Sequence, residues 1–100
     1  MAKGDASFAH GTEVQAIGLY SAAFGNQTRA AANNQFVIGK FNEIIEESIN
    51  EEDSALFIIG NGNDENSRNN AFEVYKNGTA KSKYINISND SAFFKMGSNG

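Results

Sequence analysis

The sequence contains no cysteine, a single histidine and no long apolar segment. The lack of cysteine excludes disulfides and thiol chemistry, and it leaves the redox compartment undecided. No stretch approaches the roughly 20 apolar residues of a membrane-spanning helix, and residues 1–4 do not resemble a signal peptide. The formal net charge of -4 argues against nucleic acid or an anionic membrane as a partner.

Residues for catalysis or cofactor binding are equally scarce. His10 is the one histidine around which a nucleophilic triad could be built, and no nucleophile is placed beside it by the sequence. The acidic residues stand mostly in expected loops, without the aromatic platform of a glycan-cleaving site. Residues 60–64 match the core of calcium-binding nonapeptide repeats, but such sites need tandem copies, so we expect a plain loop. We therefore expect no enzyme activity, no metal and no cofactor.

Large side chains are few in the first third of the chain, where alanine and glycine recur with a fixed spacing. Residues 7–11, 21–25 and 35–39 match when the chain is shifted by 14 residues, and residues 2–4, 16–18 and 30–32 form a second matching set. The chain therefore contains a repeat of period 14. Because residues 2–4 already stand in this register, we expect the chain to be a piece of a longer protein.

Each repeat predicts two short strands and two tight turns. Residue types alternate with a period of two, which indicates strands, and the recurring glycines supply a positive φ or a close backbone approach where the chain bends. We expect this structural role for Gly4, Gly11, Gly18, Gly25, Gly39, Gly60 and Gly97. The predicted fold class is all-β, with coils of a β-solenoid that must stack to bury their apolar face. A coil lined with alanine has little interior, so we expect further burial between chains.

The pattern Ser-x-Ala-x-Gly followed by Thr/Val-x-Ala-x-Gly resembles the head repeat of YadA-like trimeric autotransporter adhesins, over residues 2 to about 42. Residues 55–80 resemble the segment that often follows such repeats in bacteriophage and prophage tail-fibre proteins, through residues 59–62, 68–72 and 74–78. The resemblance implies a left-handed parallel β-roll of 14-residue repeats and then a short β-rich segment, in a homotrimer of parallel chains. It also implies a rigid fibre on a virion or on a bacterial cell surface.

Three segments follow from these patterns: β-roll repeats in 1–42, an acidic loop or short helix in 43–54, and a β-rich segment that clasps the chains together in 55–100. In the last segment, residues 74–80 predict a strand, an Asn-Gly turn and a strand, and residues 84–88 and 92–96 predict two more strands. In the implied trimer, we expect the core to contain His10, Phe24, Ile38, Phe57, Ile59, Phe72 and Val74.

Two functions are compatible with this sequence. The first is a structural or attachment segment that stiffens a homotrimeric fibre, with copies of itself as the partner and a host surface glycan or protein as a further candidate partner. The second is a non-catalytic or substrate-binding module of a fibre-borne glycan-degrading enzyme. A rod without a groove favours the first, whereas carboxylates clustered in a groove between chains favour the second. We adopt the first as the working hypothesis.

Overall fold

Eight β-strands and one short 3-10 helix are present in the computed structural model, which describes residues 1–86. The strands are β1 (Phe8–Thr12), β2 (Gln15–Ala16), β3 (Ala22–Asn26), β4 (Arg29–Ala30), β5 (Phe36–Lys40), β6 (Ala55–Asn61), β7 (Asn70–Tyr75) and β8 (Ala80–Ser82), and the helix is η1 (Glu51–Asp53). The predicted all-β class is confirmed. Gly97 and the strand expected at residues 92–96 lie outside the described residues. No helix within residues 1–86 is long and apolar enough to cross a membrane.

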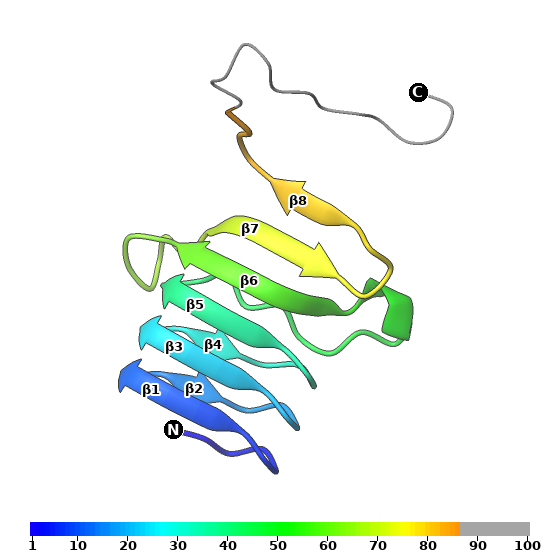
Figure 1. Ribbon diagram of the computed structural model, residues 1–100. Helices are drawn as coiled ribbons and strands as arrows, with labels where there is room; N and C mark the ends of the chain where they lie inside the picture. Colours follow the sequence, from blue (N-terminus) through cyan, green and yellow to red (C-terminus); the bar gives the residue numbers. More distant parts are fainter. Residues whose placement is uncertain (87–100) are drawn as a thin grey trace.

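The strands form one large sheet and one small sheet. The six-stranded sheet has the order β1-β3-β5-β6-β7-β8, and the two-stranded sheet pairs β2 with β4. Strands β1, β3, β5 and β6 run parallel, whereas β7 and β8 continue the sheet in antiparallel fashion. The parallel strands are stacked one above the other, with β2 and β4 behind them (Figure 1).

The 14-residue repeat is also the register of the parallel pairing. Phe8 is paired with Ala22, Ala22 with Phe36, and in the small sheet Gln15 is paired with Arg29. Equivalent residues of successive repeats therefore lie directly above one another. The next step breaks the spacing, because Phe36 pairs with Phe57, seven residues further on than the repeat requires. The loop between β5 and β6 takes up these extra residues, so the large sheet runs without a break across the expected segment boundary at residue 54.

Small side chains fill the space between the two sheets. The buried apolar residues are Val14, Ala16, Ala23, Ala30, Ala32, Val37, Ala55 and Ile58. Five of these eight residues are alanine, so the two sheets lie close together and bury little apolar area. This narrow interior agrees with the expectation from the sequence, and it gives the chain a weak hydrophobic core for its length.

The glycine columns mark places where successive repeats touch backbone to backbone. Gly11, Gly25 and Gly39 adopt positive φ angles of 134°, 117° and 103°. A Cβ on any one of them would also collide with the carbonyl oxygen of the next glycine in the chain stack, which is Gly60 above Gly39. Gly18 has no positive φ, but a Cβ there would collide with the backbone of Ala32. Glycine at 11, 25 and 39 thus allows both the positive φ and the close backbone contact, whereas Gly18 allows only the close contact.

A second regularity lies at the corners of the stack. Non-glycine residues with a positive φ recur every seven residues, at Ala6, Glu13, Tyr20, Gln27, Asn34 and Phe41, with φ between 43° and 61°. From Tyr20 onward, four backbone amides at this position each donate to a carbonyl 15 residues earlier, as Tyr20 does to Asp5 and Gln27 to Thr12. These hydrogen bonds join the corners of successive repeats. They offset the cost of holding a side chain in the left-handed region.

Two buried amide side chains end the small sheet. Asn42 is fully buried, and its Oδ1 accepts from the backbone N–H of Arg29 at 2.8 Å while its Nδ2 donates to the Arg29 carbonyl at 3.1 Å. The side chain thereby pairs with β4 as a further strand would. Gln35, also buried, accepts from the Ala31 N–H and donates to the carbonyls of Ile45 and Ala55. These two amides tie the last repeat to the following loop.

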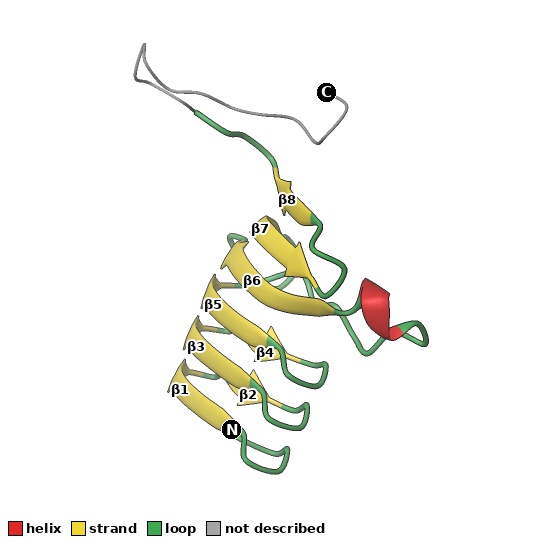
Figure 2. Cartoon of the chain, turned by 45° about the vertical axis from the view of Figure 1, so that its right-hand side comes forward, coloured by secondary structure: helices red, strands yellow, loops and turns green. Residues whose placement is uncertain are grey.

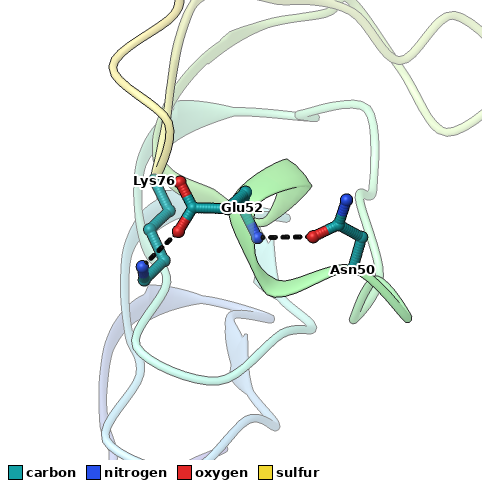
Figure 3. Close-up of polar contacts among 3 residues, drawn as sticks. All are labelled: Asn50, Glu52 and Lys76. Carbon is teal, nitrogen blue, oxygen red and sulfur yellow. Dashed lines mark hydrogen bonds and ion pairs between the residues drawn. The ribbon is translucent and has the colours of Figure 1, made fainter.

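The acidic segment 43–54 is a loop with one 3-10 turn. Ile45 packs against the core, whereas Ile49 is fully exposed, so the isoleucines do not share the face of a helix. The side chain of Asn50 accepts from the backbone N–H of Glu52 and caps η1, and Glu52 forms an ion pair with Lys76 (Figure 3). The loop is thus attached to the turn that follows β7.

The β7–β8 hairpin has the Asn-Gly turn that the sequence predicted. Gly78 adopts a φ of 93°, and its N–H donates to the Tyr75 carbonyl at 2.9 Å. The strand expected at residues 84–88 is wrong in its described part, because residues 84–86 are not strand. Alternating residue types form a strand only where a neighbouring strand supplies hydrogen-bond partners, and β8 ends at Ser82.

We expect Gly25→Ala to destabilise the fold by about 2 to 5 kcal/mol, because the new Cβ would occupy a positive φ and collide with the backbone of Gly39. The neighbouring change Asn26→Ala is the control, since Asn26 is exposed and ends β3. Chemical denaturation of both variants measures the difference. Equal midpoints would contradict the close approach of the two glycines.

We expect Asn42→Ala to cost about 2 to 4 kcal/mol, because it empties a fully buried site and leaves the partly buried N–H and carbonyl of Arg29 without their partners. Asn63→Ala, in an exposed loop, should change the free energy of unfolding by less than about 0.5 kcal/mol. Thermal unfolding followed by circular dichroism compares the two. A loss in Asn42→Ala no larger than in the control would show that Asn42 does not cap the small sheet.

Candidate interaction surface

The outward face of the six-stranded sheet carries two rows of apolar side chains. The alternation along each strand turns Ala23, Val37 and Ile58 inward, where they are buried, and leaves their neighbours on the opposite face. One row contains Phe8, Ala22, Phe36, Phe57 and Val74, and the other contains His10, Phe24, Ile38, Ile59 and Phe72. All seven residues that the sequence predicted for a trimer core therefore lie on this one face, which we call the aromatic face.

Five phenylalanine rings form a continuous ladder across the aromatic face. The ring centroids are separated by 5.2 Å between Phe8 and Phe24, 5.6 Å between Phe24 and Phe36, 5.8 Å between Phe36 and Phe57, and 6.3 Å between Phe57 and Phe72. These separations are in the range at which aromatic pairs attract each other. His10 lies at the margin of the ladder, 6.4 Å from Phe24. The ladder crosses β1, β3, β5, β6 and β7 and gives the face a fixed shape.

Within the single chain, much of the aromatic face is exposed. Phe8 is 54% exposed and Phe36 43% exposed. Between β1 and β6, the two rows contain no lysine, arginine, aspartate or glutamate. His10 is also exposed, so it does not lie inside the stack, and it is available to a neighbouring molecule. Contiguous apolar surface of this kind in a soluble protein marks an interaction site.

Sequence reasoning missed Phe8 and Phe36, although both are among the more exposed rings of the face. The glycine column drew attention to the residue just before each glycine, and these two phenylalanines stand two residues earlier still. The alternation of residues along the predicted strands could have identified them, because residues two apart on a strand share a face. Extending each column by two residues would have found them.

The opposite face of the β7–β8 hairpin is polar. The hydroxyl of Tyr75 donates to Oε1 of Glu73 at 2.7 Å, and Asn70 donates to Oε2 of the same carboxylate at 2.8 Å. The ammonium of Lys81 lies 5.0 Å from the centre of the Tyr75 ring. Burial, and then the hydrogen bond to Glu73, raise the pKa of Tyr75 to about 12. The two hydrogen bonds lie within β7, the Lys81 contact joins β8 to β7, and Tyr75 also packs against the buried core.

A groove of about 480 Å³ lies between the corner of the last repeat and the acidic loop, and Asn33, Asn34, Glu47, Glu51 and Lys76 contribute to its lining. The hydrogen bond from Lys76 to Glu52 raises the pKa of Lys76 above its ordinary value. Amides, carboxylates and an ammonium are groups that hydrogen-bond to sugar hydroxyls.

Residues 60–64, which match the core of calcium-binding repeats, make contacts within the chain. Gly60 and Gly62 are buried and lie against the backbone of Asn42 and Phe41, and the Asp64 carboxylate accepts from the Asn66 N–H in a local turn. Residues 1–86 contain no cluster of three or more histidine or acidic side chains that could hold a metal ion.

Comparison with known proteins finds no matching family model, no matching curated protein and no matching solved structure. The chemistry of the surface therefore carries the functional argument.

We expect the raised pKa of Tyr75 to make the fold sensitive to high pH. The unfolded chain releases this proton near pH 10, whereas the folded chain holds it to about pH 12, so stability is present below pH 10 and falls as pH rises between these values. Tyr75→Phe should remove the part of this decline that belongs to Tyr75. Thermal melts from pH 8 to pH 11.5 measure it, and parallel profiles of the two proteins would contradict the burial of the hydroxyl.

Proposed function

We propose that this chain is a structural and attachment segment of a homotrimeric fibre, in which residues 1–42 form a left-handed parallel β-roll and the aromatic face is buried between chains. The observation that carries the proposal is the aromatic face itself, which is apolar, continuous over five strands and exposed in the single chain. The resemblance of the repeat to YadA-like adhesin heads supports the trimer. The same resemblance supports a place on a virion or on a bacterial surface.

Burial against copies of the same chain follows from the energetics of one repeat stack. The interior contains mostly alanine, so a single chain gains little from hydrophobic burial. Full burial of an exposed phenylalanine contributes about 1.5 to 3 kcal/mol, and two phenylalanines of this face, Phe8 and Phe36, are about half exposed. Association therefore supplies the burial that the interior lacks.

The aromatic face also avoids charge repulsion between copies of the chain. The chain has a formal net charge of -4, so copies of it repel one another unless their contact avoids the charged side chains. The two rows from β1 to β6 meet this condition, because they contain no acidic or strongly basic residue. A stiff stack of this kind spaces whatever lies at its ends, and its outer surface is free to contact a host glycan or protein.

A second role draws support from the groove beside the acidic loop. Its amide and carboxylate side chains suit a non-catalytic or substrate-binding module of a fibre-borne glycan-degrading enzyme. We propose no catalytic role for these groups, because the carboxylates of the groove stand on an exposed loop.

We expect three chains of 10.8 kDa to associate at micromolar concentration, as measured by light scattering or native mass spectrometry. Phe36→Asp, which places a charge on the aromatic face, should reduce the assembly to monomers. Asn63→Asp adds the same charge on an exposed loop and should leave three chains together. A wild-type chain that is folded as a monomer would contradict the proposal. A Phe36→Asp variant that still forms trimers would also contradict it.

A further inference from the structure

The corner between the small sheet and β3 carries a second exposed apolar patch. Ile17, Leu19 and Tyr20 are 38%, 41% and 63% exposed, although all three are large apolar or aromatic side chains. The loop that contains them lies at the end of the large sheet where the parallel strands begin, and it leads into β3 (Figure 2). Tyr20 is one of the positive-φ corner residues, so the turn itself directs its side chain. We call these three residues the corner patch.

We propose that the corner patch of one chain packs against the aromatic face of the next chain in the assembly. This inference rests on the proposed trimer. In a closed cyclic trimer every contact is heterologous, so the surface that a chain presents to one neighbour differs from the surface that it presents to the other. The aromatic face supplies one of these surfaces. The corner patch is a further exposed apolar surface of the same chain, and we infer that it supplies the second.

The position of the corner patch along the stack satisfies the symmetry. Rotation about an axis parallel to the stacking direction moves each atom sideways and leaves its height unchanged. Ile17, Leu19 and Tyr20 lead directly into β3, which carries Phe24. The two most exposed rings of the aromatic face, Phe8 and Phe36, lie on the strands immediately below and above β3. The two patches therefore stand at the same height.

The corner patch suits an apolar partner better than the opposite corner does, because the opposite corner is polar. The opposite corner carries Glu13 and Gln27, whose side chains hydrogen-bond to each other at 2.5 Å, as polar groups facing water do. The corner patch is also confined to one repeat. The equivalent positions are Asp5 and Ala6 in the repeat below, and Asn33 and Asn34 in the repeat above. The chain therefore presents the large apolar side chains of this corner at one height of the stack.

The absence of cysteine from the sequence allows a direct test by disulfide cross-linking. The full chain would carry Tyr20→Cys together with Phe36→Cys or, in a second variant, with Phe8→Cys. A disulfide forms only where two Cα atoms approach within about 7 Å. Mild oxidation should link the double variants into covalent dimers and trimers, at a yield at least about tenfold above that of any single-cysteine variant, because each corner meets a face and not another corner. Glu13→Cys with Phe36→Cys, on the polar corner, is the matched control and should stay unlinked.

The other outcomes overturn the proposal, and they separate it from the trimer itself. If Phe36→Cys or Phe8→Cys alone links to its own copies, the aromatic faces meet each other and the corner patch is not the partner. If both double variants stay unlinked while light scattering still shows three chains, the trimer stands and the proposed contact is wrong. If the wild-type chain is a monomer, both the trimer and the contact are wrong.

Discussion

The close approach of backbone to backbone along the glycine columns is the constraint on which the structure depends. Gly11, Gly25 and Gly39 each lie against the next glycine of the stack with no room for a Cβ. This approach keeps equivalent residues directly above one another, as the 14-residue register requires. Without that register the phenylalanines would not form rows, and without the rows there would be no continuous apolar face. The aromatic face is therefore a consequence of where glycine is placed.

The same geometry explains why the interior is thin and the exterior apolar. Sheets that lie close together leave room mostly for alanine and valine between them, and the phenylalanines of the large sheet point outward. The phenylalanines of the outward rows pack against each other in a ladder, and the exposed parts of their rings remain for a second molecule. A globular domain buries its large apolar side chains inside one chain. In the proposed trimer, this chain buries them between chains.

The sequence predicted the all-β class, the 14-residue repeat and seven residues that share the aromatic face, because stacking turns a linear period into a spatial column. It predicted the turns between the strands, but not the positive φ of the non-glycine residues at the corners. The residues with a positive φ are as different as Ala6, Glu13 and Phe41, so no shared side-chain chemistry reveals their seven-residue spacing. Backbone hydrogen bonds between repeats select that conformation. Nor did the sequence show that Asn42 replaces a strand, because asparagine is common in the chain, and only the fold distinguishes a buried cap from an exposed turn residue.

The central claim is that folding and association bury the same face, and the dependence of the melting temperature on protein concentration tests it most directly. If the folded state is an assembly of three chains, mass action stabilises it as the concentration rises. The account predicts that the melting temperature increases steadily over a roughly hundredfold range of protein concentration that starts at low micromolar. A melting temperature that stays constant over this range, with a single cooperative transition, would show that the chain folds alone and would contradict the account.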